Sequence, residues 1–201
     1  MTDETPYNPL DKLHLGESVA DALISRPIME LPPPQQFIGA GIYAIYYAGN
    51  FVPYKPITRK NIPDRWTTPI YVGKAIPPGA RKGGLGLGAT SGNTLYNRLR
   101  DHADSIILAE NLDIADFKVR YLVVDDIWIP LGENMLIEKY APLWNRFIDG
   151  FGNHDPGRGR YAQKKSPWDM LHPGRPWANR LSACEKTEGQ LIEKIKNALS
   201  E

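Results

Sequence analysis

The sequence is poor in the residues that build disulfide-bonded or membrane-spanning proteins. Its 201 residues include one cysteine, Cys184, so no disulfide can form within the chain and a reducing compartment is expected. No apolar run approaches the roughly 20 residues that cross a bilayer, and the first residues, M-T-D-E-T-P, lack a signal-peptide pattern. These absences predict a cytoplasmic protein without a membrane partner.

The formal net charge is also small, at +1, so total charge does not identify a nucleic-acid binder. The distribution is less even. Residues 1–31 hold six acidic and two basic side chains, whereas residues 150–180 hold six basic and two acidic ones. Two interpretations stay open at this point: the second segment meets a polyanion, or both segments are ordinary solvated surfaces.

The chain does contain the patterns of a globular domain, with 42% hydrophobic and 23% charged residues. Three runs rich in branched and aromatic residues predict strands: G-I-Y-A-I-Y-Y at 41–47, P-I-Y-V-G-K-A at 69–75 and F-K-V-R-Y-L-V-V at 117–124. Tyr43 and Tyr71 lie in the first two. Taken alone, each is equally well explained as a core tyrosine with a satisfied hydroxyl.

Helices are predicted near 11–25, 93–105 and 132–140. The first is a short amphipathic helix that ends before Arg26-Pro27. In the second, Arg98 and His102 are four residues apart and share a face, which also fits an exposed pair on a solvated helix. The third opens with Glu133, and a glutamate in a first turn often only complements the helix dipole.

Taken together and in order, these pieces resemble the GIY-YIG nucleases. The matching residues are G-I-Y at 41–43, Y-V-G-K-A at 71–75, R-L at 98–99 with His102 four residues after the arginine, and E-x-x-L-I-x-x-Y-x-P-x-x-N from Glu133 to Asn145. Two further segments, G-F-G-N-H-D-P-G at 150–157 and H-P-G-R-x-W-A at 172–178, resemble the type II restriction endonucleases of that family, in the branch of the Eco-twenty-nine-k enzyme.

The resemblance implies an α+β fold with a small three-stranded antiparallel sheet flanked by helices. The expected parts are an N-terminal arm with a short helix (1–38), a nuclease core (39–148) with insertions at 48–69 and 76–91, and a C-terminal extension (149–201). The extension is expected to hold a basic DNA-contacting segment and a terminal helix. The proline-rich first insertion is interpreted as a surface excursion between the strands.

The resemblance also implies a catalytic set. Glu133 is expected to hold one Mg²⁺ ion, which Mn²⁺ could replace, because Mg²⁺ is commonly bound through one or two carboxylates. Arg98 is expected to bind a phosphate oxygen through its fork of donors. Tyr43 is the expected general base, and a free tyrosine has a pKa of about 10, so Arg98, Lys74 or the metal must favour its phenolate.

Three further residues complete this implied set. Tyr71 and His102 are expected to hold the water or phosphate and to relay protons, and Asn145 to position its neighbours by hydrogen bonds. The glycine-rich insertion lacks the G-K-[ST] ending of a nucleotide-binding loop. It is interpreted as a DNA-contacting loop, with a merely flexible loop as the alternative. The expected DNA contacts are Lys74, Arg81, Lys82, Arg158, Arg160 and Arg175, with Arg59 and Arg65 as further candidates for reading bases.

The function that follows from the resemblance is a type II restriction endonuclease that cuts double-stranded DNA. A homodimer on a palindromic, GC-rich site is expected, with CCGCGG as the specific guess and a DNA methyltransferase protecting the same site. The apolar face of the arm could clasp either the core or a second subunit. One alternative is a nicking or structure-specific GIY-YIG nuclease, although such proteins usually carry added modules. Another is a DNA-binding module without catalytic activity.

Overall fold

The computed structural model describes residues 8, 10–77 and 92–200. The strands are β1 (Met29–Glu30), β2 (Gly41–Tyr47), β3 (Asn61–Ile62), β4 (Arg65–Trp66), β5 (Pro69–Ala75) and β6 (Phe117–Val123). The helices are α1 (Lys12–Ile24), α2 (Lys55–Thr58), α3 (Thr94–Ile107), α4 (Ile129–Tyr140), α5 (Leu143–Arg146), α6 (Pro167–Leu171) and α7 (Glu188–Leu199). The fold is therefore α+β, as expected, and no helix of the described residues is long and apolar enough to span a membrane.

The main sheet has four antiparallel strands in the order β1-β6-β2-β5, rather than the three that were expected. The additional strand is β1, which comes from the N-terminal arm and pairs Met29 with Val119 and Glu30 with Lys118. The Lys118 ammonium also lies 2.6 Å from the Glu30 carboxylate. A two-residue strand is too short to show an alternating pattern in the sequence, so pairing with β6 is what makes this segment extended.

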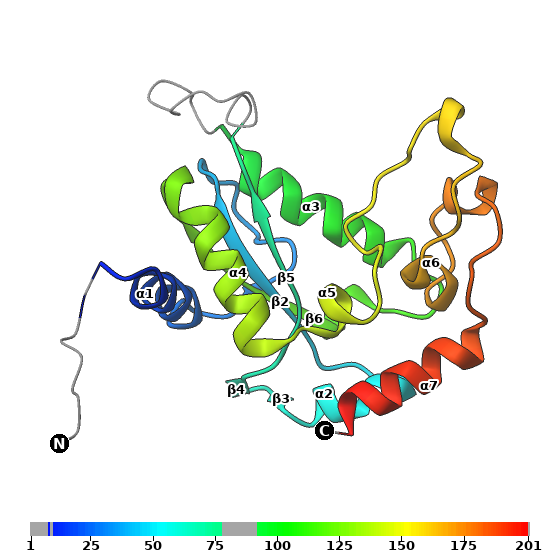
Figure 1. Cartoon of the computed structure of the whole chain (residues 1–201), viewed down its shortest axis with the longest axis horizontal. Helices are drawn as coiled ribbons and strands as arrows, with labels where there is room; N and C mark the ends of the chain where they lie inside the picture. Colours follow the sequence, from blue (N-terminus) through cyan, green and yellow to red (C-terminus); the bar gives the residue numbers. More distant parts are fainter. Residues whose placement is uncertain (1–7, 9, 78–91, 201) are drawn as a thin grey trace, which may run out of the picture.

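Strand β2 forms the centre of the sheet, and all seven of its residues are buried. Side chains alternate across a strand, and Tyr43 accordingly packs in one hydrophobic core and Ile42 in a second one on the other face. The first core also contains residues of α3, α5, α6 and α7, and the second contains residues of α1 and α4. Figure 1 shows α1 beside α4, away from α3. The face of β2 that carries Tyr43 therefore looks toward α3.

Helix α1 packs against α4 of its own chain (Figure 1). Ala20 and Leu23 are fully buried in the second core, and a Cβ atom at Gly16 would lie 2.9 Å from the Met135 side chain. The sequence left two positions open for this arm, on the core or on a second subunit. In the structure its apolar face covers the core.

The insertion between β2 and β5 is not the surface excursion that its prolines suggested. It folds into α2 and the β3–β4 hairpin, and it places Tyr54 and Ile57 in the core, where they are 0% and 2% exposed. Asn61 fastens the segment, because its amide donates to the carbonyls of Tyr47 and Thr68 at 3.1 and 2.8 Å. Proline limits the helix to four residues without preventing burial of the aromatic side chains between them.

Helix α4 begins at Ile129, three residues earlier than predicted, with a proline in its first turn. Glu133 therefore lies in the second turn, and the interpretation that it complements the helix dipole from the first turn is wrong. The helix ends at Tyr140 because Ala141 adopts the left-handed conformation, with φ of 41°. Pro142 then starts α5, which packs Trp144 into the core at 2% exposure.

Candidate active site

A buried tyrosine–histidine pair links the central strand to α3. The hydroxyl of Tyr43 and Nε2 of His102 are 2.6 Å apart, and the two side chains are 0% and 1% exposed. β2 positions the tyrosine, and the buried face of α3 positions the histidine four residues after Arg98. The structure thus brings together two of the predicted catalytic residues that are 59 positions apart in the sequence.

Gly73 of β5 provides the space for the Tyr43 hydroxyl. The two residues are partners in the antiparallel register. A Cβ atom at Gly73 would lie 2.4 Å from the hydroxyl oxygen, which is well inside van der Waals contact. A side chain at this position would displace the phenol from His102, so the glycine of Y-V-G-K-A is required by this close approach.

The local environment keeps both partners of this pair neutral. Burial raises the pKa of Tyr43 well above its usual value, the neighbouring Tyr71 raises it further, and the charge and hydrogen bond of Arg98 only partly offset this. Burial and the charge of Arg98 lower the pKa of His102 well below its usual value. Arg98 thus acts on the pKa of Tyr43 in the expected direction, but burial outweighs this positive charge, so the phenol stays neutral in the protein on its own.

Tyr71 joins this pair from β5. Its ring centroid is 6.2 Å from that of Tyr43 and 5.2 Å from that of His102. Burial raises its pKa, Arg98 lowers it, and the charge of Glu133 raises it. Two phenols, one imidazole and one guanidinium therefore lie within electrostatic reach of each other and of one carboxylate.

Arg98 lies at the outer side of this cluster and contacts a loop that the sequence analysis gave no catalytic role. Its Nη2 donates to the carbonyl oxygen of Gly152 at 3.0 Å, and its Nη1 contacts Nε2 of His154. Both partners belong to the segment G-F-G-N-H-D-P-G, which was noted only as a family resemblance. That motif was the available signal, but nothing in its residue types indicated a contact with α3.

Glu133 forms an ion pair with Lys74 across the β5–α4 contact, with Nζ and Oε2 2.6 Å apart. The side chains are 34% exposed for the lysine and 14% for the glutamate. Among the described residues no group of three or more His, Cys, Asp and Glu side chains could together hold a metal ion. A single carboxylate suits Mg²⁺, which keeps several waters and takes phosphate oxygens as its other ligands. The donor set thus fits one hard cation, with Glu133 as the protein ligand.

Asn145 contacts the backbone of the strand that carries Tyr71 and Lys74. Its Oδ1 accepts from the Val72 N–H and its Nδ2 donates to the Val72 carbonyl, both at 2.8 Å. The amide thereby satisfies a donor and an acceptor of β5, as a neighbouring strand would. This geometry agrees with the positioning role expected for Asn145.

A surface groove of about 550 Å³ lies beside this cluster. Its lining includes Lys74, Thr94, Asn97, Arg98, Asp101 and His154. One wall comes from β5, another from α3, and the third from the segment around Gly152. The groove gives a ligand in solution direct access to Arg98 and to Lys74, the ion-pair partner of Glu133.

Of the six residues expected to contact DNA, Lys74 lines the groove, and the other five fall into three groups. Arg158 and Arg160 are exposed on a short turn, whereas Arg81 and Lys82 lie outside the described residues. Arg175 is 1% exposed, and its guanidinium is taken up by Asp169 and by backbone carbonyls. The prediction that Arg175 contacts DNA is therefore corrected: it is an interior residue that holds a loop.

Comparison with known proteins gives a family match over most of the chain. A family model described as the Eco29kI GIY-YIG domain matches residues 35–199. The match includes the two tyrosines, the helix α3 residues, Glu133 and the loop around Gly152. No match was found among curated proteins.

Proposed function

Because the chain belongs to the Eco29kI GIY-YIG family of restriction-type nucleases, we propose that it is a type II restriction endonuclease. It hydrolyses phosphodiester bonds in both strands of a double-stranded DNA site, with a divalent cation. The observation that carries this proposal is the Tyr43–His102 hydrogen bond of 2.6 Å beside Arg98 at the edge of an open groove. A phosphate bound in that groove would contact the positive charge of Arg98, and the hydroxyl of Tyr43 could exchange a proton with Nε2 of His102.

The proposed role of Tyr43 is to take a proton from the attacking water. Its own proton then passes to Nε2 of His102, so that the phenol accepts one proton while it gives up another. Burial and Arg98 disfavour a charged imidazole at His102. We therefore expect the transfer to accompany attack on phosphorus rather than to precede it.

Arg98 supplies positive charge where negative charge develops on the phosphate. A guanidinium suits this role because its planar donors match phosphate oxygens and because it stays protonated. Such preorganised charge in a partly water-excluded site stabilises the transition state more than it stabilises the substrate. Tyr71, beside Tyr43 and His102, is proposed to hold the attacking water or a phosphate oxygen.

Glu133 is the proposed ligand of a single Mg²⁺ ion, with Mn²⁺ as a substitute. A bound cation would neutralise charge on the phosphate and assist departure of the leaving oxygen. In the protein alone Lys74 pairs with Glu133, so the carboxylate is kept beside the groove by an opposite charge. Lys74 is also a proposed contact to the DNA backbone, together with Arg158 and Arg160.

The proposed substrate is a palindromic, GC-rich duplex, with CCGCGG as the specific candidate. One active site of this kind can attack one phosphodiester at a time. A homodimer on a two-fold DNA sequence would therefore cut both strands. A DNA methyltransferase that protects the same sequence is the proposed functional partner. Without such methylation the enzyme would also cut the DNA of its own host. We propose that the enzyme acts in the cytoplasm.

Digestion of a sequenced plasmid with Mg²⁺, followed by mapping of the ends, tests the function. Restriction activity gives discrete linear fragments whose ends share one palindrome, and a methylated plasmid resists. Nicked circles or cleavage only at branched DNA would favour the alternative nuclease. Absence of any cleavage with Mg²⁺ or Mn²⁺ would contradict the proposal.

A further inference from the structure

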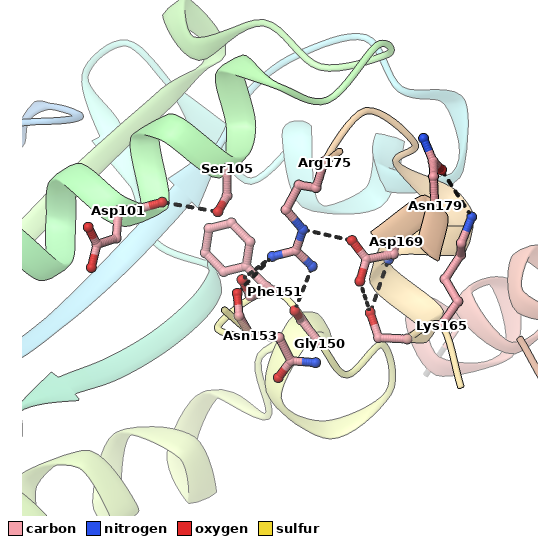
Figure 2. Close-up of polar contacts among 10 residues, drawn as sticks. Asp101, Ser105, Gly150, Phe151, Asn153, Lys165, Asp169, Arg175 and Asn179 are labelled. Carbon is pink, nitrogen blue, oxygen red and sulfur yellow. Dashed lines mark hydrogen bonds and ion pairs between the residues drawn. The ribbon is translucent and has the colours of Figure 1, made fainter. Parts of the chain in front are cut away.

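Arg175 is the most completely bonded charged side chain of the C-terminal extension. Its Nε lies 2.7 Å from Asp169 Oδ1, and both side chains are 1% exposed. Its Nη2 donates to the Gly150 carbonyl at 2.9 Å, as Figure 2 shows. Nη1 donates to the carbonyls of Phe151 and Asn153, each at 3.1 Å. Because an unpaired buried charge is costly, these carbonyls have little freedom to move away, and the loop is held at three points.

The loop that Arg175 holds contacts the tyrosine–histidine cluster through the side chain of Phe151. The Phe151 ring stacks on His102, with centroids 4.5 Å apart and planes at 17°. The same ring meets Tyr71 edge-on at 5.0 Å. The loop therefore covers the imidazole and the second phenol.

Gly152 brings the backbone of this loop against Arg98. A Cβ atom at this position would lie 3.0 Å from Nη2 of Arg98 and 3.0 Å from the Tyr71 hydroxyl. A side chain here would make both groups shift by a few tenths of an ångström, whereas glycine leaves them in place while its carbonyl accepts from the guanidinium at 3.0 Å. His154, two residues further on, then contacts Nη1 of the same guanidinium.

We propose that His154 is a positioning residue for the cleavage reaction, which holds the Arg98 guanidinium together with the Gly152 carbonyl. This inference rests on the proposed nuclease function. An arginine can only donate, so Nε2 of His154 must be the acceptor and the proton of its neutral ring must be on Nδ1. Acceptors on two nitrogens of one planar group fix both its position and its rotation.

The chemical nature of the two acceptors matters as much as their position. A carbonyl and a neutral imidazole fix Arg98 without neutralising it, and none of the ion pairs among the described residues includes Arg98. Arg175 is the contrasting case, because Asp169 offsets its charge. His154 thus aims Arg98 while the positive charge stays available to a phosphate in the groove.

A double-mutant cycle on the full-length protein tests this coupling. The variants are His154→Ala, Arg98→Lys and the double variant, measured by single-turnover cleavage of a duplex that carries the mapped site. His154→Ala should slow cleavage roughly 10- to 100-fold, the scale of a misplaced catalytic group. In the Arg98→Lys background the same change should cost less than about 2-fold, because the guanidinium that it positions is gone.

Two further variants separate positioning from a general loss of structure. His154→Gln keeps an acceptor and should recover part of the rate, whereas Asn153→Ala removes an exposed neighbouring side chain and should stay within about 2-fold of wild type. The thermal midpoint and the DNA dissociation constant should change little in His154→Ala, His154→Gln and Asn153→Ala. Equal effects of His154→Ala in both backgrounds would overturn the inference while the nuclease function stands.

A readout without cleavage keeps the two proposals distinguishable. In ¹⁵N-labelled protein without DNA, the guanidinium N–H signals of Arg98 should be resolved and slowly exchanging, and His154→Ala should abolish this. If wild type cuts no DNA, the proposed function fails, and the Arg98 signal still tests the contact. An Arg98 signal that His154→Ala leaves unchanged would show that His154 does not hold this side chain.

Discussion

The described part of the chain contains two buried tyrosine–histidine pairs, and their surroundings differ. Tyr43 and His102 are 2.6 Å apart between hydroxyl and Nε2, and Tyr54 and His172 are 2.7 Å apart between the same atoms. Burial raises the pKa of each tyrosine and lowers that of each histidine, to about 3 for His172. The pairs are thus alike in geometry and in protonation.

In the second pair, the tyrosine and the histidine each make one further hydrogen bond to a neutral group. The Tyr54 hydroxyl also accepts from Nε1 of Trp144 at 2.9 Å, and Nδ1 of His172 lies 2.8 Å from Oδ1 of Asn111. These bonds join the insertion after β2, α5 and the C-terminal extension. A buried, fully bonded polar network of this kind specifies how the segments pack.

The first pair adjoins Arg98, Tyr71 and the Lys74–Glu133 ion pair, beside a groove. The same chemical pair therefore serves packing where neutral partners saturate it and is suited to catalysis where charges and an opening lie next to it. Residue type and burial alone do not separate the two roles. The following predictions test that difference.

The largest effect is expected when the carboxylate beside the first pair loses its charge. Glu133→Gln should reduce the cleavage rate by at least about 10³-fold, the upper range for loss of one preorganised electrostatic group, with DNA affinity largely retained. Glu138→Gln, on an exposed position of the same helix, is the matched control. Loss of specific DNA binding as complete as the loss of cutting would instead show that Glu133 is structural.

Removal of the charge that holds the covering loop should have the next largest effect. Arg175→Met leaves the buried Asp169 carboxylate without its opposite charge, with only the Ser166 hydroxyl as a donor, and frees three carbonyls, so the free energy of unfolding should fall by about 3–5 kcal/mol. Urea unfolding measures this, with the exposed Arg180→Met as a control expected within about 0.5 kcal/mol of wild type. An equally small change for Arg175→Met would contradict the role of this residue in fixing the loop.

The sequence was sufficient to predict the strands and helices that have strong local residue patterns. The strands with G-I-Y and Y-V-G-K-A begin and end at the predicted residues, because branched and aromatic runs favour extended backbone. Helix α3 likewise follows from its apolar spacing. These elements carry Tyr43, Tyr71 and His102, but only the family resemblance indicated that the three side chains form one site.

The parts that were missed depend on contacts between distant segments. Strand β1 exists because β6 pairs with it, and Arg175 is buried because Asp169 and three carbonyls surround it. An arginine within a basic segment looks the same in sequence whether it faces DNA or the interior. The contact of His154 with Arg98 joins residues 56 positions apart, and no local pattern encodes it.

Both pairs predict that acid destabilises the fold. The pKa of His102 and that of His172 are lowered in the folded protein, so the unfolded chain binds more protons below the ordinary histidine value of about 6.5. Stability is then full above that pH and falls as the pH drops toward the folded values, by about 1.4 kcal/mol per pH unit for each histidine.

Urea unfolding at several pH values between about 6 and 5, above the main range of carboxylate titration, measures this slope. His172→Gln should remove the share of one histidine, about 1.4 kcal/mol per pH unit, from the slope of unfolding free energy against pH. The contribution of His102 should remain. A stability that is independent of pH in this window would contradict the neutral state assigned to both histidines.

The smallest effect is expected for surface charges away from both pairs. Arg158→Ala and Arg160→Ala should each weaken DNA binding and reduce the slope of log affinity against log salt by about 1 if the side chain contacts a phosphate. Binding to cognate and scrambled duplexes at two salt concentrations separates such contacts from base reading. Unchanged affinity and slope in both variants would exclude this turn from the DNA interface.

The most direct test of the account compares Tyr43→Phe with Tyr54→Phe, since each removes one hydroxyl from one of the two pairs. Single-turnover cleavage and urea unfolding are measured on both variants. Tyr43→Phe should cut at least about 100-fold more slowly with a modest change in stability. Tyr54→Phe should lose about 1–3 kcal/mol of stability, because Trp144 and His172 lose their partner, while the folded protein cuts at close to the wild-type rate. Similar cleavage rates for the two variants would contradict the assignment of catalysis to the Tyr43–His102 pair.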